Sequence, residues 1–282
     1  MTNRPSLLPL SALFGVGVAL SLPVFAFPPA PGFTVYGNVR DPLGWVVDSA
    51  DATIILSASS GAVEIARSAI RSGRVNENYR VMLPLDQNRS GEAYKPGAVE
   101  EATPFVITVE IDGLTYLPVE TVVTPVEGAK AAEFLRLDLT LGTDSDGDGL
   151  PDLWEQWQLE TAGLPPFALD LINPEDDLDH DGLTNYQEYI AGTFAYLGTD
   201  RLSLAIKNRG SDGWNRLEFL AIIDKTYVIE QSTDLKTWTP VSFTLSDDRT
   251  ALRTEWKATD TVMRSVQIES AAPTATYRLT VR

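Results

Sequence analysis

The sequence predicts a mainly β protein in which two β-sandwich domains, of the immunoglobulin or fibronectin kind, flank a small acidic module of loops and helices. Three observations support this fold class. Two long segments carry short runs of β-branched and aromatic residues separated by turn sequences. The segment between them holds two acidic loops that start 33 residues apart. The length of 282 residues suits two or three domains of about 100–150 residues each.

Residues 1–26 have the pattern of a signal peptide, so we expect the mature protein to be exported. Arg4 precedes an apolar stretch from Leu7 to Leu22, and Val24 and Ala26 stand at the −3 and −1 positions of a small-residue cleavage site. An uncleaved membrane anchor is the alternative, which the cleavage site and two nearby prolines disfavour. The expected location is outside the cytoplasm: secreted or at the cell surface, with the periplasm also open. No later segment is apolar for long enough to cross a bilayer.

Residues 33–141 are predicted to form the first sandwich. Turn sequences such as DPLG, SGR and KPG separate its strands, and no long helical pattern intervenes. The expected strands are FTVYGNVR (33–40), ATIILSAS (52–59), NYRVMLPL (78–85), FVITVEI (105–111), LTYLPVETVV (114–123) and FLRLDLTL (134–141).

Residues 200–282 are predicted to form the second sandwich, because seven strand-like runs in about 80 residues suit a fibronectin-like domain. The expected strands are LSLAI (202–206), RLEFLAI (216–222), TYVIEQS (226–232), TPVSFTL (239–245), LRTEWKA (252–258), RSVQIES (264–270) and TYRLTVR (276–282).

The chain changes character between these domains, over residues 142–197. The whole protein has a net charge of −17, and thirteen acidic residues without any lysine or arginine lie between Asp144 and Glu188. This balance excludes a basic nucleic-acid surface and a polybasic membrane patch. A solvated acidic tail would share the imbalance but not the regular spacing or the Trp, Leu and Tyr residues of this segment. The chain has no cysteine, so something other than disulfides must stabilise it outside the cell.

The two acidic loops match the pattern of a twelve-residue calcium loop. Such a loop needs oxygen donors at positions 1, 3, 5, 9 and 12, a glycine at position 6 and a backbone carbonyl at position 7. The first loop supplies Asp144, Asp146, Asp148, Gly149, the Leu150 carbonyl, Asp152 (directly or through water) and Glu155. The second supplies Asp177, Asp179, Asp181, Gly182, the Leu183 carbonyl, Asn185 and Glu188. Two complete copies predict two bound Ca²⁺ ions, and magnesium is the weaker alternative because it takes fewer protein ligands.

Each loop is predicted to lead into a short helix. Pro151 suits the first turn of the first helix, and Thr184 with Gln187 forms a capping box for the second, which Gly192 should end. Pro151 also stands where a paired EF-hand uses a backbone N–H, so the loops depart from a calmodulin-type sensor.

The D-x-D-x-D-G-L-x-D/N-x-x-E pair resembles the calcium repeats of bacterial extracellular proteins with thrombospondin type 3 or dockerin-like EF-hand repeats. The flanking segments VYGNVRDPLGW, NYRVMLPLD, YVIEQSTDLKTW and YRLTVR are similar to those of secreted multidomain proteins of Verrucomicrobia and their relatives. The resemblance implies that the acidic loops bind calcium and stiffen an extracellular rod. A true dockerin pairs two near-identical loop-helix repeats, and the linker between these two loops does not fit that pattern.

These observations favour a secreted structural or adhesive protein in which calcium rigidifies the link between two sandwiches. A module that binds an extracellular glycan or protein is the second hypothesis, and a hydrolase the third. Trp154, Trp157, Tyr186 and Tyr189 could stack on sugars, but their helical spacing favours a core. The single histidine, His180, has no partner for a catalytic triad or a zinc site, so we expect no catalytic residue. Paired carboxylates for glycoside cleavage leave no sequence signature and stay open.

Overall fold

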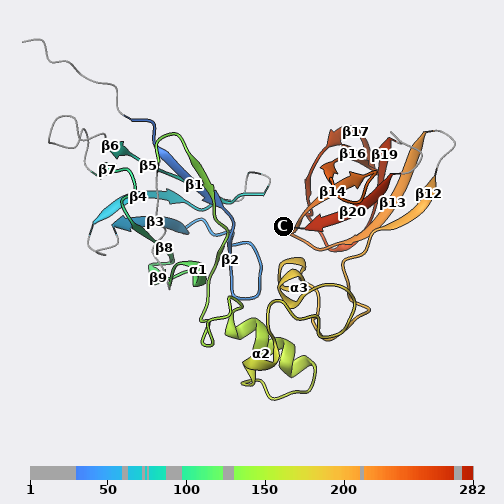
Figure 1. Cartoon of the computed structure of the whole chain (residues 1–282), viewed down its shortest axis with the longest axis horizontal. Helices are drawn as coiled ribbons and strands as arrows, with labels where there is room; N and C mark the ends of the chain where they lie inside the picture. The colour runs from blue at the N-terminus through green and yellow to red at the C-terminus, as the bar shows by residue number, and fades with distance from the viewer. Residues whose placement is uncertain are drawn as a thin grey trace, which may run out of the picture.

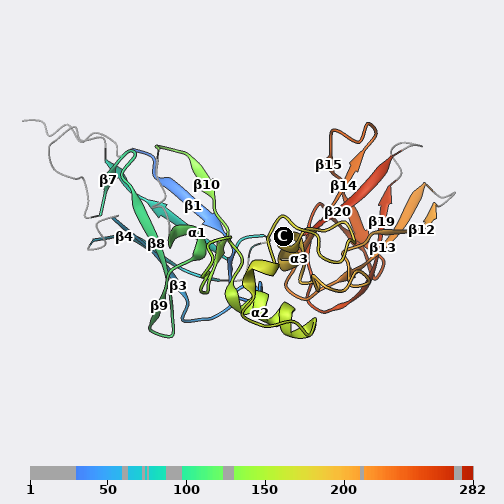
Figure 2. The same cartoon turned by 60° about the horizontal axis from the view of Figure 1, so that its bottom comes forward.

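The computed structural model describes residues 30–58, 63–71, 74, 76–86, 97–122, 130–209, 213–269 and 275–281. The predicted signal peptide, residues 1–26, lies outside the described residues. The protein is mainly β, as the sequence predicts, and its strands form several sheets. Two β lobes stand apart, and the helices α2 and α3 lie between them at the base of a V (Figures 1 and 2).

The N-terminal lobe consists of two main sheets that face each other. One sheet has the order β10-β1-β5, in which β1 pairs with β10 in parallel and with β5 antiparallel. The other has the order β4-β3-β8-β9 and is antiparallel. The first sheet and its extension comprise β1 (Phe33–Gly37), β2 (Val39–Arg40), β5 (Tyr79–Leu83), β10 (Phe134–Arg136) and β11 (Leu139–Thr140). The remaining strands are β3 (Thr53–Ala58), β4 (Glu64–Ala69), β6 (Leu85–Asp86), β7 (Val99–Glu100), β8 (Phe105–Ile111) and β9 (Leu114–Tyr116).

The core of this lobe forms where the inward faces of the two sheets meet. Val35 and Val81 from the first sheet and Ile54 and Ile107 from the second belong to one buried cluster. In β5 the residues alternate between buried and exposed, so a single strand supplies the core with one face and the solvent with the other.

Two local predictions in this lobe are wrong. The expected strand LTYLPVETVV ends at Tyr116, and the short helix α1 (Val119–Val122) follows it. Pro118 explains the change, because proline cannot continue a strand ladder and has a backbone angle that suits the start of a helix. The strand β4 was not predicted, and Ile65 is the only side chain of this strand that is buried, so the strand lacks a clear alternation of buried and exposed residues.

The C-terminal lobe repeats the arrangement of two facing sheets. One sheet has the order β12-β13-β19-β16-β17, and in the other β14 pairs with β15, β18 and β20. Leu217 and Val266 of the first sheet share a buried cluster with Tyr227 and Ile229 of the second. The strands are β12 (Ala205–Arg209), β13 (Trp214–Ala221), β14 (Thr226–Ser232), β15 (Thr239–Pro240), β16 (Phe243–Leu245), β17 (Asp248–Arg253), β18 (Trp256–Lys257), β19 (Val262–Glu269) and β20 (Thr276–Val281).

The segment between the lobes holds α2 (Asp152–Thr161), a 3-10 turn η1 (Leu169–Leu171) and α3 (Asn185–Ala191). It has a small core of its own, made of Leu150, Trp154, Leu159, Ile172, Tyr189 and Ala195. The predicted capping box of Thr184 and Gln187 is present, and Gly192 ends α3 in a left-handed conformation. Within the described part of the chain, no helix combines the length and the apolar character that crossing a bilayer requires.

Candidate metal centre

The two acidic loops have the same backbone conformation. In each, the aspartate at position 1 accepts hydrogen bonds from the backbone N–H groups of positions 5 and 6, at 3.2 and 3.0 Å. The aspartate at position 5 accepts one from position 7, at 2.8 Å in both loops. The N–H of position 9 donates to the carbonyl before position 1, at 2.9 Å in the first loop and 2.7 Å in the second. The repeat found in the sequence is therefore also a structural repeat.

Each loop brings three aspartates together. The carboxylate oxygens of Asp144, Asp146 and Asp148 lie within 4.8 Å of one another, and those of Asp177, Asp179 and Asp181 do the same. The left-handed glycines Gly149 (φ 100°) and Gly182 (φ 101°) make the sharp turn that allows this convergence. Like charges at this separation repel each other, so each group favours a cation at its centre.

The position-12 glutamate of the first loop is buried without a partner. Glu155 is 0% exposed, and neither of its carboxylate oxygens forms a hydrogen bond with a described residue. Burial, with further contributions from Asp146 and Asp148, raises the pKa of Glu155 to about 9. A carboxylate that is ionised here lacks the donor or counter-charge that buried acids normally have.

Glu188, at position 12 of the second loop, lies in a similar environment. It is 0% exposed, and Oε1 accepts a hydrogen bond from Thr193 Oγ1 at 3.2 Å while Oε2 has no partner. Burial, with the charges of Asp179 and Asp181, raises the pKa of Glu188 to about 8. Both loops thus place one buried glutamate beside their group of three aspartates.

The position-9 residues differ between the loops. Asp152 accepts hydrogen bonds from the Ser145 N–H at 2.7 Å and from its hydroxyl at 2.6 Å. Asn185 is 0% exposed, donates from Nδ2 to the Asn173 carbonyl at 2.6 Å and leaves Oδ1 without a partner. The amide oxygen of Asn185 is therefore free to bind an ion, whereas the Asp152 carboxylate already holds its own loop together.

The position-7 residues differ in burial. The Leu150 side chain is 0% exposed and belongs to the buried cluster, and the Leu183 side chain is half-buried. The backbone carbonyls of both residues remain predicted ligands.

The exit helices, α2 after the first loop and α3 after the second, pack against each other through aromatic residues. Trp154 and Tyr189 are buried and meet edge to face, with ring centroids 5.6 Å apart. For these two residues the predicted core role is confirmed. For Trp157 and Tyr186, which are 42% and 46% exposed, it is wrong. Trp157 instead packs beside Phe194, with centroids 4.9 Å apart.

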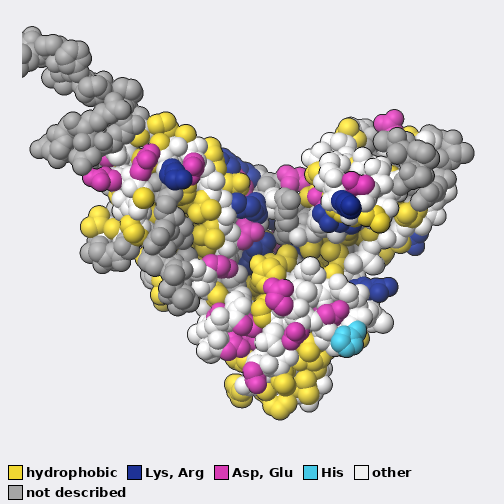
Figure 3. Space-filling view, in the orientation of Figure 1, with side chains coloured by type: hydrophobic (Ala, Val, Ile, Leu, Met, Phe, Trp, Pro, Cys, Tyr) yellow, Lys and Arg dark blue, Asp and Glu magenta, His cyan; other side chains and the backbone are white. Residues whose placement is uncertain are grey.

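His180 has a conformational role that the sequence analysis did not identify. Its φ is 61°, and Gly147, at the same position 4 of the first loop, has φ 78°. Position 4 therefore requires the left-handed region, which histidine adopts at some cost and glycine does not. The His180 side chain is exposed on the surface of the module (Figure 3).

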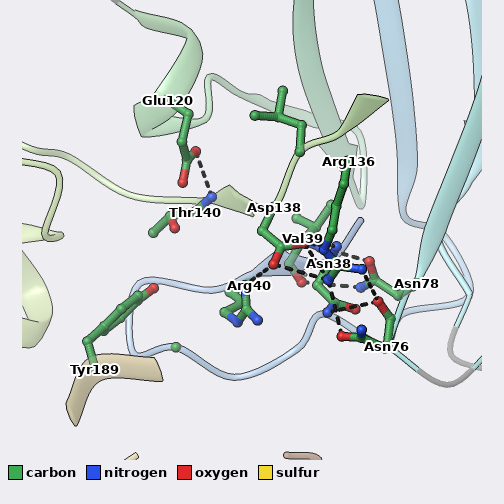
Figure 4. Close-up of polar contacts among 12 residues, drawn as sticks. Asn38, Val39, Arg40, Asn76, Asn78, Glu120, Arg136, Asp138, Thr140 and Tyr189 are labelled. Carbon is green, nitrogen blue, oxygen red and sulfur yellow. Dashed lines mark hydrogen bonds and ion pairs between the residues drawn. The ribbon is translucent and has the colours of Figure 1, made fainter. Parts of the chain in front are cut away.

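A turn of the N-terminal lobe, residues 41–45, meets both the module and the C-terminal lobe. The Tyr189 hydroxyl donates to the Asp41 carbonyl at 3.2 Å, and its ring points toward the paired strands β2 and β11 (Figure 4). From the C-terminal lobe, Lys225 Nζ donates to the Gly44 carbonyl at 3.0 Å and lies 5.7 Å from the Trp45 ring centroid. Lys225 is only 1% exposed, and burial lowers its pKa to about 7. We refer to residues 41–45 with Tyr189 and Lys225 as the junction.

Polar contacts around the buried Arg40 and Thr140 support the junction from the N-terminal lobe. The Arg40 side chain is 2% exposed and lies 3.6 Å from Asp138, and the Thr140 N–H donates to Glu120 at 2.9 Å (Figure 4). Sequence reasoning found no signal for these residues, because their contacts join segments that are distant along the chain.

In comparisons with known proteins, no family model, curated protein or solved structure matches this chain significantly.

Proposed function

We propose that this chain is an exported structural or adhesive protein in which two Ca²⁺ ions, one in each acidic loop, rigidify the link between two immunoglobulin- or fibronectin-like sandwiches. The observation that carries the proposal is the burial of Glu155 and Glu188 beside the two groups of aspartates, with carboxylate oxygens that no described residue satisfies.

Electrostatics supports a cation in each loop. Burying an ionised carboxylate costs several kcal/mol unless a counter-charge compensates it. In the first loop the nearest charges are themselves acidic, and they add to the cost. A bound divalent ion converts these repulsions into attractions and supplies the missing partner for the buried oxygens.

The donor set favours calcium over magnesium. Calcium takes six to eight oxygen ligands in flexible geometry, with a bidentate glutamate at position 12 and a backbone carbonyl at position 7. Magnesium keeps several waters and needs near-ideal octahedral geometry. A loop that offers three aspartates, a carbonyl and a buried glutamate fits the larger ion.

The second loop is placed so that its ion would stiffen the junction. Glu188 and Tyr189 are neighbours on α3, and the Tyr189 side chain contacts residues 41–45 of the N-terminal lobe. Lys225 contacts the same turn from the C-terminal lobe. An ion that fixes α3 therefore fixes one side of the turn that both lobes share.

Calcium titration by calorimetry tests the proposal. We expect two bound ions for the mature protein, and one for Glu155→Gln or Glu188→Gln, since each substitution removes the charge of one position-12 ligand. Magnesium at the same concentration should bind more weakly. Fewer than two calcium ions in the unsubstituted protein would contradict the proposal.

Export and the absence of catalysis are parts of the same proposal. The signal-like N-terminus and extracellular calcium concentrations fit loops with Kd values of about 10⁻⁴–10⁻³ M. N-terminal sequencing of exported protein should begin near Phe27. Replacement of His180 by Gln should abolish no activity.

A further inference from the structure

The outer face of the sheet β10-β1-β5 is unusually cationic for so acidic a protein. The strand register places Tyr36 of β1 between Arg80 of β5 and Arg136 of β10. The guanidinium carbons of Arg80 and Arg136 lie 5.0 and 5.9 Å from the Tyr36 ring centroid. Phe134 lies beside them on β10, 66% exposed and 6.0 Å from Arg80.

A hollow of about 350 Å³ adjoins this face. Its lining includes Ser68, Arg71, Arg74, Glu77, Asn78 and Arg80. The Arg71 side chain is exposed and has no ion-pair partner among the described residues. Dark-blue side chains gather on this flank of the N-terminal lobe, which faces the opening of the V (Figure 3).

Buried or half-buried acids hold the arginines in place. Glu77, which is 9% exposed, accepts hydrogen bonds from Arg74 at 2.7 Å and from Arg80 at 2.8 and 3.1 Å. Arg136 donates to Asp138 at 2.9 Å and to the Asn76 carbonyl at 3.0 Å (Figure 4). Fixed guanidinium groups lose little conformational entropy when they bind a ligand, so this arrangement is preorganised.

The charge of the surface is opposite to that of the whole chain. The four guanidinium groups of Arg71, Arg74, Arg80 and Arg136 and the two carboxylates of Glu77 and Asp138 leave a net charge of +2, in a protein of net charge −17. We propose that this face and the adjoining hollow bind an acidic polysaccharide through its carboxylate or sulfate groups.

The combination of groups selects this ligand class. The Arg71 guanidinium, which has no ion-pair partner among the described residues, can bind a carboxylate or sulfate in a bidentate manner, and the paired arginines beside it add positive charge. The exposed Phe134 ring offers an apolar surface for the C–H face of a sugar. Single-stranded nucleic acid fits less well, because the described residues of this face offer one largely exposed aromatic ring, Phe134, rather than the series of rings on which successive bases stack. The surface uses no residue of the acidic loops, so this proposal stands or falls independently of calcium binding.

Affinity electrophoresis and calorimetry with the full chain test the proposal. The probes are polygalacturonate for carboxylate, heparin for sulfate and dextran as the neutral polymer. We expect at least one acidic polymer to bind, dextran not to bind, and added salt to weaken the binding. The double variant Arg71→Gln/Arg74→Gln should lower the affinity about tenfold or more, since charged hydrogen bonds are lost. Phe134→Ala should also lower it.

Arg67→Gln is the matched control, because Arg67 is an exposed arginine that pairs with Glu64 outside the hollow. It should leave the affinity unchanged. The proposal is overturned if neither acidic polymer binds, if Arg67→Gln weakens binding as much as the double variant, or if single-stranded DNA binds equally well. Self-association of the chain that the double variant abolishes, without polymer binding, would instead identify a second copy as the occupant.

Discussion

Substitution of Glu155 by Gln should stabilise the calcium-free protein and reduce its response to calcium. The side chain keeps its shape but loses the charge that is buried beside the aspartates of the first loop. Without calcium, that charge has no partner among the described residues. With calcium, the same charge would be a ligand. One substitution therefore has opposite effects on the two states.

The stability that Glu155→Gln should gain in chelator follows from the pKa of Glu155. Burial and four aspartates raise the pKa of Glu155 from 4.5 to about 9. An acid with a raised pKa in the folded state contributes stability below pH 4.5, and this contribution is lost as the pH rises toward 9. At about 1.4 kcal/mol per pKa unit, the loss between pH 4.5 and pH 7 is at most about 3.5 kcal/mol. Glu155→Gln should recover up to this amount and should remove the corresponding fall in stability with pH.

The calcium-dependent stability that Glu155→Gln should lose follows from mass action. A site contributes about 2.7 kcal/mol to the free energy of unfolding when free calcium is 100-fold above Kd. Two sites of this kind contribute about 5 kcal/mol, and the variant should keep only the contribution of the second loop. In differential scanning calorimetry, the loss corresponds to roughly 5–10 °C of the calcium-induced shift in Tm.

The matched control is Glu160→Gln, which makes the same change of charge at an exposed position of the same helix. It should change neither the stability in chelator nor the calcium-induced shift. The reasoning is refuted if Glu155→Gln leaves both quantities as they are in the unsubstituted protein, or if Glu160→Gln reproduces its effects.

Three further predictions concern the module and the junction. Limited proteolysis should cleave within Gly163–Asn173 faster in chelator than in calcium, and equal rates would show that calcium does not order this linker. Gly44→Ala should lower the free energy of unfolding in urea by about 1–3 kcal/mol, because φ is 84° and a Cβ would lie 2.8 Å from the Tyr189 carbonyl oxygen. Gly113→Ala is the control: φ is 78° and no atom lies within 4 Å of its Cβ, so it should cost only the backbone strain. Burial lowers the pKa of Lys225 from 10.5 to about 7, so the unfolded chain binds more protons between these values and stability should rise with pH. Relative to Lys225→Met, the rise should reach up to about 1.4 kcal/mol per pH unit, and a difference that stays constant from pH 7 to 9 would contradict it.

The sequence predicted features that depend on neighbouring residues better than features that depend on distant ones. The limits of β8 and β14 match the expected runs because alternation and turn residues are local signals. Both acidic loops were located for the same reason, since a twelve-residue loop contains most of its own hydrogen-bond partners. The junction was not predicted, because nothing near Lys225 in the sequence indicates that its ammonium group is buried against Gly44.

The aromatic residues of the exit helices show the same limit. Trp154 and Trp157 have the spacing of one helical face, as do Tyr186 and Tyr189, so periodicity assigns all four to a core. The structure buries Trp154 and Tyr189 against each other and leaves the other two about half exposed. A short helix with one partner buries only the side chains that face that partner, and the sequence does not specify which these are.

A comparison of the two loops shows which positions their common conformation fixes and which positions can vary. They share aspartates at positions 1, 3 and 5, a glycine at 6, a leucine at 7 and a buried glutamate at 12. They differ at position 4, where Gly147 and His180 adopt the same left-handed region. They also differ at position 8, the N-cap of the following helix in both loops, where Thr184 caps α3 with its side chain and Pro151 precedes α2 without a side-chain cap. The shared positions supply the oxygens or the backbone turn that the proposed ion site needs. Position 4 needs only a residue that tolerates positive φ, and position 8 only one that can stand directly before a helix. If the shared residues served only to shape the loop, neither copy would need a buried glutamate with an unsatisfied oxygen. The pair of glutamates therefore supports a bound ion more strongly than the aspartates do.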